Sequence, residues 1–515
     1  FSRERRTHSS FLLHRLDMKR STYLFYILLV SWLGLLVSCD GLEEHYATNP
    51  TLRLSFSTDT LAFDTVFSSV GSTTRQFMVY NRHDEPLNME QVMLASGEAS
   101  GFRMNLDGRK GSRFQQVGIA AQDSMYVFVE VTVNPHGQNQ PLLVQDSILF
   151  TVNGVRQSVL LEAYGQDVHL CKGGVTLTSD TLLAADRPYL IYDSLVVAEG
   201  VNVDIAKGAT FYLHDKANVV VYGSMRAKGT REEPILFRGD RLDYILNDVL
   251  PYDRTPGQWG GIWFRPTSFQ NEWEHVVVRN GTYGVTCDPS IPDQPKLRIR
   301  HSQLTNMSQD LFTVVNGDVE VTDTEFSNAG GSVMVLVGGS YYFAHCTMAN
   351  FMKLTTRQLA ADAQSLDSKC LYLLNEATVN GQGPYSIRKA YFDNCLIDGS
   401  HSAGNLSSTG EIQLSDGEYD YRFNHCLLKA KETADSRFDE VLFVAESPLY
   451  RLNGGKDDKY AFDFRLDSVT APGVGKADLA ISKLYPQDRY GVNRLQSANG
   501  PTIGAYEFVP NDQEE

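Results

Sequence analysis

The stretch Ile299–Met348 contains the segments IRHSQL (299–304), VTDTEF (321–326) and FAHCTM (343–348), three copies of one six-residue pattern. The pattern is an apolar residue, any residue, Asn, Asp or His, then Ser, Thr, Cys or Val, any residue, and a second apolar residue. Three further copies lie outside this stretch, as WEHVVV (273–278), FDNCLI (392–397) and FNHCLL (423–428). This repetition decides the fold.

The copies recur at the period of a stacked repeat. Their first residues are 26, 22, 22, 49 and 31 positions apart, and the 49 corresponds to two turns or to one turn with an inserted loop. A period of twenty-odd residues, with short strand patterns and no helical periodicity, is typical of a parallel β-helix in which each repeat is one coil. A single coil cannot bury its own apolar face. The coils are therefore expected to stack at strand spacing, about 4.8 Å.

The third position of the pattern predicts a sharp bend. Strict alternation from an inward first residue would leave the sixth outward, yet the sixth is apolar in every copy, so the strand phase slips between them. A bend of this kind places one residue in the left-handed region, where Asn, Asp and His are enriched among non-glycine residues. The residues at this position are His275, His301, Asp323, His345, Asn394 and His425.

The same column offers an alternative interpretation as a metal or proton site. His301, Asp323 and His345 would lie one above another on neighbouring coils, within reach of a shared ion. The left-handed requirement already accounts for these residue types, and a metal needs converging rather than merely stacked ligands. We therefore expect no metal and no other cofactor, with these three residues as the candidates if a metal binds.

The fourth position predicts an inward row of small side chains. Cysteines buried there behave as small hydrophobes, and parallel side-chain vectors on successive coils do not point at each other. We therefore expect thiols rather than disulfides at Cys346, Cys395 and Cys426. The sequence does not pair Cys171, Cys287 and Cys370.

Residues 51–168 have a different all-β pattern. Val127, Val129, Val131 and Val133 fall on one face of a predicted strand, and turn signals such as Asn153-Gly154 separate the strands. About seven strands in this length predict a β-sandwich that resembles immunoglobulin-like modules. The predicted fold class is thus all-β, with this sandwich followed by a right-handed parallel β-helix with a C-terminal cap over residues 169–515.

The N-terminal sequence predicts where the protein is located in the cell. Residues 1–17 resemble an over-extended start, and residues 18–38 read as a signal peptide with a basic segment and a short apolar core. Leu36-Val37-Ser38-Cys39 resembles the lipobox of bacterial lipoproteins, which makes Cys39 the lipidated residue and 39–50 a tether. The acidic residues after Cys39 resemble a signal for surface display, so we expect an outer-membrane lipoprotein that faces outward, with the periplasmic face as the alternative.

The net charge of the chain argues against one class of binding partner. The 515 residues carry a formal net charge of −16 and are 42% hydrophobic, as in ordinary globular proteins. A chain this acidic repels phosphate backbones, so no nucleic-acid partner is expected.

Two longer motifs carry a family resemblance. VVVYGSMRAKGTREEPILF (Val219–Phe237) and GQWGGIWFRPTSFQN (Gly257–Asn271), together with the repeats, resemble the right-handed parallel β-helix proteins, which include secreted surface proteins and polysaccharide lyases. Asp463–Leu466 and Ile503–Glu507 resemble the closing segment of such domains, which we expect to cover the last open sheet edge. The lyases of this fold use carboxylates that gather calcium, or an Arg, with a Lys, Arg or His as base. No motif here matches either set.

Two functions remain open at this level. The first is a binding role for a glycan or a surface partner, for which we expect aromatic side chains to stack on sugar rings, namely Tyr341, Tyr342, Tyr419 and Tyr421. The second is a polysaccharide lyase or another carbohydrate-active enzyme that uses the groove of the β-helix, which rests on fold analogy. Converging Asp, Glu, Lys or Arg side chains along one outward strand face of the β-helix would discriminate between the two and favour the enzyme. We expect binding rather than catalysis.

Overall fold

A computed structural model describes residues 45–246, 250–291, 293–355, 357, 367–454 and 460–510. Residues 1–17, the predicted signal peptide 18–38, and Cys39 with the rest of the first half of the tether (39–44) lie outside the described residues. The chain divides into two compact units. The first contains the residues up to Leu61, Thr73–Glu130 and Gln145–Glu162, and the second contains Ala62–Ser72, Val131–Val144 and the chain from Ala163 onward. The predicted boundary between residues 168 and 169 stays a prediction.

The N-terminal part is a β-sandwich of two five-stranded antiparallel sheets, as predicted. Val127, Val129 and Val131 are buried on alternate positions, and the Asn153-Gly154 turn has positive φ at both residues (51° and 72°), as a type I′ hairpin requires. One sheet contains β1 (Ser55–Phe56), β3 (Arg75–Tyr80), β8 (Ser124–Val131), β5 (Phe102–Leu106) and β6 (Arg109–Gly111). The other contains β2 (Thr60–Phe67), β10 (Val155–Gln166), β9 (Leu142–Val152), β4 (Leu87–Leu94) and β7 (Arg113–Ile119).

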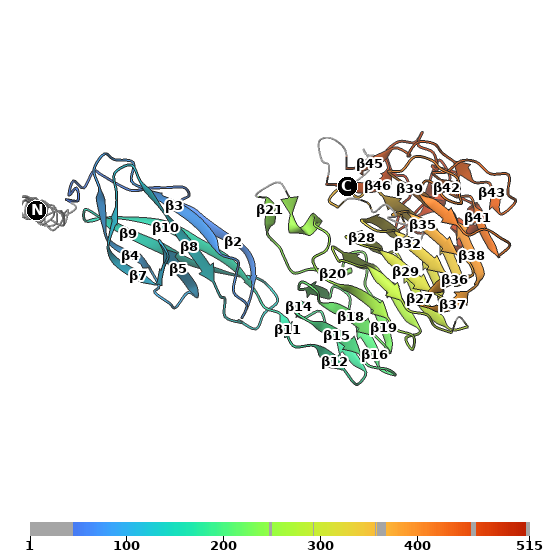
Figure 1. The fold of residues 1–515 in the computed structure, drawn as a ribbon, viewed down its shortest axis with the longest axis horizontal. Helices are drawn as coiled ribbons and strands as arrows, with labels where there is room; N and C mark the ends of the chain where they lie inside the picture. The colour runs from blue at the N-terminus through green and yellow to red at the C-terminus, as the bar shows by residue number, and fades with distance from the viewer. Residues whose placement is uncertain are drawn as a thin grey trace, which may run out of the picture. The chain divides into compact units, whose positions relative to one another are not determined.

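The chain then forms a right-handed parallel β-helix, which confirms the predicted fold class. The β-helix contains three parallel sheets of 11, 9 and 10 strands. Its coils stack on one another, from the coil with β11 and β12 to the coils with β41 and β43 (Figure 1). The first sheet consists of β11 (His169–Cys171), β14 (Tyr189–Ile191), β17 (Thr210–Leu213), β20 (Ile235–Gly239), β25 (Val276–Arg279), β28 (Gln303–Met307), β31 (Glu325–Ala329), β34 (Thr347–Asn350), β39 (Leu396–Gly399), β42 (Leu427–Leu428) and β44 (Leu442–Phe443).

The other two sheets complete each coil. The second consists of β12 (Val175–Leu177), β15 (Ser194–Val197), β18 (Asn218–Val221), β23 (Gly261–Phe264), β26 (Val285–Cys287), β29 (Phe312–Val315), β32 (Met334–Val337), β35 (Leu371–Leu374) and β40 (Ile412–Leu414). The third consists of β13 (Thr181–Leu183), β16 (Asn202–Ile205), β19 (Ser224–Lys228), β24 (Asn271–Glu274), β27 (Pro295–Arg300), β30 (Asp318–Thr322), β33 (Gly339–Ala344), β38 (Ile387–Asp393), β41 (Tyr421–Asn424) and β43 (Phe438–Asp439).

Short elements decorate the coils. They are the hairpins β21 (Tyr244–Leu246) with β22 (Leu250–Pro251), β36 (Ala377–Val379) with β37 (Gln382–Tyr385), and β45 (Tyr450–Asn453) with β46 (Phe462–Leu466), and the helices η1 (Tyr252–Arg254), α2 (Leu479–Leu484) and η2 (Arg494–Gln496). The 49-residue gap between two repeats is one coil with an insertion, because β33 pairs directly with β38.

The six repeats form the corner between the third sheet and the first. One residue separates the two strands in the first repeat and two residues separate them in the other five. In every repeat the third residue of the pattern has a φ between 47° and 54°, which confirms the predicted left-handed bend. Both apolar positions point inward: the first residues pair in register from Trp273 to Phe423, and the sixth residues pair in register from Val278 to Leu428. All twelve of these side chains are at most 1% exposed.

The fourth position of the repeat serves as a hydrogen-bond acceptor between coils. The amide of Val276 donates to the Ser302 hydroxyl (3.0 Å), and the amide of Cys395 donates to the Cys426 sulfur (3.4 Å). Cys346, Cys395 and Cys426 are buried and free, which confirms the predicted thiols, and Cys171, Cys287 and Cys370 are free as well. Small polarisable side chains thus satisfy amides that the sharp bend removes from the sheet ladders.

An inward charge tests this packing. Phe326 is fully buried between Leu304 and Met348 of the neighbouring coils. Replacing it with Asp buries an unpaired carboxylate, so Phe326→Asp should lower the free energy of unfolding by several kcal/mol, roughly 3–5. Urea unfolding measures the change. Thr313→Asp, on an outward position of β29, is the control and should cost less than about 1 kcal/mol; equal effects would show that Phe326 does not point inward.

Candidate functional site

The three outward faces of the β-helix differ in what covers them. On the first sheet, Asp253 of the β21–β22 insertion pairs with Arg238 (2.8 Å) and Arg279 (2.9 Å), and further along, residues from Tyr450 to Phe508 pack on Ala349, Leu396 and Leu427. On the second sheet, the β36–β37 hairpin packs on Val315, Val335 and Tyr372. The third sheet instead presents a continuous row of polar and aromatic side chains.

We call this row the ladder. Its members are paired in register on successive strands, about 4.8 Å apart. They are Asp204, Arg226, Glu272, Arg298, Glu320, Tyr342, Tyr391 and Arg422.

Opposite charges alternate along the first five positions of the ladder. Arg226 pairs with Asp204 (2.7 Å), and Arg298 lies 3.5 Å from Glu320. Glu272 is held by Lys228 of the adjacent row (2.7 Å), and this hydrogen bond lowers the pKa of the Glu272 carboxyl. Each such exposed pair contributes only about 0.2–1 kcal/mol, so the charges stay available to a polar ligand.

The last three positions of the ladder are aromatic and cationic. Tyr391 donates a hydrogen bond to Asp420 (2.8 Å), which raises the pKa of its phenol. The Arg422 guanidinium lies 5.0 Å from the centre of the Tyr391 ring and 2.9 Å from Asp393. Tyr342 is half-buried, with its ring centre 6.4 Å from that of Tyr485.

Of the four tyrosines expected to bind sugars, two are buried. Tyr341 is 0% exposed and Tyr421 is 7% exposed, so their expected surface position is wrong. Successive strand residues point to opposite faces, and Tyr341 and Tyr421 each lie two positions before an inward Phe, Phe343 and Phe423. Tyr342 is on the outward face, and Tyr419 is half-buried with its ring 4.8 Å from that of Tyr421.

A hollow of about 350 Å³ lies near the aromatic end of the third sheet. An edge of Tyr421 reaches it beside Phe438, and Asp435 and Arg437 supply charged groups to its wall. The Arg437 guanidinium lies 4.1 Å from the centre of the Tyr421 ring and pairs with Asp435 (2.6 Å). Aromatic and charged groups therefore meet at this end of the coil stack.

The left-handed corner binds the C-terminal segment, residues 471–508. Asp323 pairs with the buried Arg494 (2.9 Å), and His345 shares a hydrogen bond with the Ser482 hydroxyl (3.0 Å). The Asn394 side chain accepts from the Asp478 amide (2.7 Å) and donates to the Asp478 carbonyl (3.1 Å). These contacts run along the corner, where buried polar turn residues need partners. That the closing segment covers the last open sheet edge stays a prediction.

The predicted metal candidates are therefore separated by other contacts. His301 Nε2 lies 3.9 Å from Asp323, but Asp323 faces Arg494, and His345 hydrogen-bonds to Ser482. Burial raises the pKa of Asp323 to about 7, although Arg494 beside it opposes the rise. Among the described residues, the group whose ligand atoms all lie within 4.8 Å of one another is Glu274, His275 and His301.

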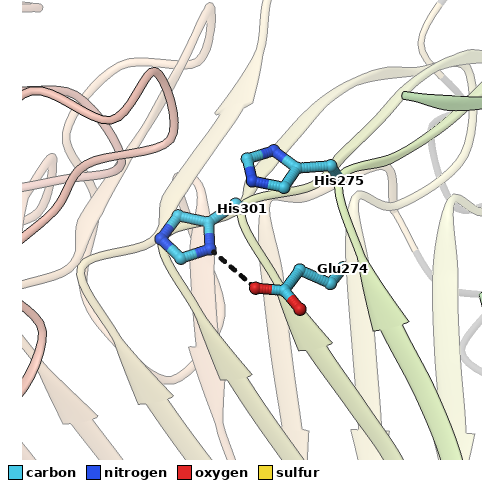
Figure 2. Close-up of side chains that lie close together, drawn as sticks. All are labelled: Glu274, His275 and His301. Atoms are coloured by element: carbon cyan, nitrogen blue, oxygen red, sulfur yellow. Dashed lines mark ion pairs between the residues drawn. The ribbon is translucent and has the colours of Figure 1, made fainter. Parts of the chain in front are cut away.

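Figure 2 shows how these three side chains lie. His275 and His301 occupy the same left-handed position on adjacent coils, and their rings stack with centres 5.1 Å apart and planes 15° apart. Glu274 ends β24 and places a carboxylate oxygen 3.9 Å from His301 Nδ1. Burial lowers the pKa of His301 to about 4 and lowers that of His275, so both rings are neutral at pH 7.

Sequence reasoning missed the ladder, although the repeat contains its signal. From Glu272 to Arg422, each ladder residue directly precedes the inward first residue of a repeat and must therefore point outward. The residues at this position are Glu272, Arg298, Glu320, Tyr342, Tyr391 and Arg422. Charged side chains therefore line one outward strand face, stacked in register on successive strands.

Comparisons with known proteins give no family. No protein-family model and no curated protein matches the sequence. Solved structures that match in part include the Vibrio cholerae VesB protease (14% identity, TM-score 0.17, 22% of this chain and 32% of that one) and a Porphyromonas gingivalis W83 protein of unknown function (15%, 0.17, 25% and 60%). A PapD-like domain of human CEP192 also matches (11%, 0.16, 25% and 95%). The chain covers less than two thirds of the first of these structures, and TM-scores this low do not establish a shared fold or function.

The buried His345 makes stability depend on pH. Burial lowers its pKa well below the usual value near 6.5, so the unfolded chain binds a proton before the folded protein does. Stability should therefore fall as the pH drops below about 6.5, by up to about 1.4 kcal/mol per pH unit for this one proton. His345→Asn keeps a residue type that suits the left-handed turn and should flatten this fall.

Urea unfolding of both proteins between pH 8 and pH 5 measures the effect. At pH 8 the difference between them reports the lost contacts of His345 with the Ser482 hydroxyl and the Asn394 side chain, both 3.0 Å. A parallel loss of stability in the two proteins on acidification would show that His345 is not held neutral.

Proposed function

We propose that this protein is a cell-envelope lipoprotein that binds a glycan along the ladder of the third sheet. The observation that carries the proposal is the in-register row of exposed charged side chains that ends in Tyr342, Tyr391 and Arg422. Sugar recognition combines ring stacking on aromatic faces with hydrogen bonds to charged groups, and both lie at strand spacing here. The parallel β-helix fold fits carbohydrate-binding and carbohydrate-active proteins generally.

The charge pattern favours a neutral glycan. The ladder presents Asp204, Glu272 and Glu320 as well as guanidinium groups, and the whole chain carries −16. A polyanionic sugar would meet these carboxylates at every second strand, whereas the hydroxyls of a neutral sugar can donate to carboxylates and accept from Arg side chains.

Burial makes His301 a poor candidate for the base of an elimination. A lyase needs a base that removes a proton, and His301 stands beside Arg300 at the edge of the ladder face. Because burial lowers the pKa of His301 to about 4, its imidazole is a weak base at neutral pH.

Tyr391 provides the test of glycan binding. Tyr391→Ala should weaken binding of the best neutral polysaccharide in a panel about tenfold, or about 1.4 kcal/mol, by titration calorimetry. Tyr126→Ala on the sandwich, which removes a tyrosine that is 44% exposed, is the matched control and should bind like the original protein. Binding that Tyr391→Ala leaves intact, or new ultraviolet absorbance on uronate polymers, would contradict the proposal, the latter in favour of a lyase.

We propose that Cys39 carries the lipid anchor and that the protein faces outward from the outer membrane. The support is the lipobox-like Leu36–Cys39 and the acidic stretch after it. Among the described residues, no helix has the length and apolar character needed to span a membrane.

Cys39→Ser tests the anchor. In a bacterial host that processes lipoproteins, the original protein should incorporate labelled palmitate and sediment with membranes, and Cys39→Ser should do neither. Protease treatment of intact cells then separates the outer surface from the periplasmic face. Sedimentation and labelling that persist in Cys39→Ser would rule out this anchor.

A further inference from the structure

The corner of the β-helix uses its polar residues unequally. The C-terminal segment hydrogen-bonds or ion-pairs with Asp323, His345 and Asn394. On the two coils before them, His275 and His301 stack on each other and face Glu274 (Figure 2), and the segment reaches His301 through a hydrogen bond with the backbone of Gln487. Among the described residues, His301 Nδ1 is a buried nitrogen with no hydrogen-bond partner, although the Glu274 carboxylate lies 3.9 Å away.

This gap has the size of a metal ion bridge. Zinc binds imidazole nitrogen at about 2.0–2.1 Å and carboxylate oxygen at about 2.0–2.2 Å, so one ion between two such ligands spans up to about 4.3 Å. The 3.9 Å separation of His301 Nδ1 and Glu274 Oε1 falls within that span and is too long for a hydrogen bond. The remaining ligand atom belongs to His275 and lies within 4.8 Å of the others. Because this half-buried ring stacks on that of His301, it has to rotate for its nitrogen to point at the ion.

The donor set suits a zinc-class ion. Two imidazoles and one carboxylate form a three-ligand set that leaves a fourth position open. Metal ligation needs neutral imidazole, and burial keeps both rings neutral at pH 7. Glu274, Glu232 and Asp323 add negative charge near the rings, while Arg231, Arg300, Arg489 and Arg494 oppose it.

We propose that Glu274, His275 and His301 bind one divalent transition-metal ion of the zinc class at the edge of the ladder face. The ion links two neighbouring coils through equivalent positions of the repeat and adds a positive charge beside Arg300 and Lys228. The proposal rests on the geometry of these three side chains and does not depend on glycan binding.

Zinc titration calorimetry on the full chain tests the site. The protein should bind one ion that Glu274→Gln, His275→Asn and His301→Asn each weaken at least tenfold. Asn suits the left-handed turn, as Asn394 shows at the same position of the repeat (φ 54°). His425→Asn makes the same exchange at the last copy of the repeat and should bind zinc like the original protein.

Cobalt(II) absorption separates this site from the cysteines. Binding at the cluster should give a visible ligand-field band without the ultraviolet thiolate-to-metal band, and His301→Asn should remove it. Thermal melting of each variant without metal confirms that it folds. Zinc binding that all three cluster variants retain, a cobalt spectrum dominated by thiolate, or no zinc binding by the folded original protein would overturn the proposal.

Discussion

The β-helix depends on one backbone constraint: in the six repeats, the chain passes from the third sheet to the first at a tight corner that contains one residue with φ near 50°. This left-handed residue keeps inward residues on both sides of the bend, because it shifts the alternation of the strand by one position. Asn, Asp and His tolerate this conformation and also carry polar side chains. The corner therefore places a column of hydrogen-bonding groups on the outside of the coil stack, and the rest of the molecule has to satisfy them.

The C-terminal segment is the main answer to that requirement. Polar side chains at the corner cost free energy when buried without partners, and residues 471–508 supply those partners from Asp478, Ser482 and Arg494. Arg494 is 0% exposed and faces Asp323, so removing either group alone would leave a buried charge uncompensated. The C-terminal segment is thus held against the coils by the same left-handed residues that form the corner.

Most of the architecture could be predicted from the sequence, and the chemistry could not. The repeat alone gave the sheets, the left-handed column and the thiols of Cys346, Cys395 and Cys426. The predicted surface position of Tyr341 is wrong because it rests on the adjacent pair Tyr341-Tyr342, whereas strand alternation sets Tyr341 inward and Tyr342 outward. The approach of Glu274 to His301 and of Arg494 to Asp323 depends on side-chain rotamers and on contacts 171 positions apart in the chain, which no local pattern encodes.

The fold explains the charged positions of the ladder but not its two tyrosines. From Asp204 to Glu320, alternating charges pair across strands, and this pairing already explains them as register-fixing contacts. Tyr342 and Tyr391 break that alternation, yet inward stacks such as Phe343 on Phe392, with ring centres 5.1 Å apart, already stabilise the same two strands. Two outward tyrosines on successive strands are therefore more than the sheet requires. Under the proposed function, this excess of aromatic surface beside Arg422 is where the glycan would gain most from contact with the third sheet.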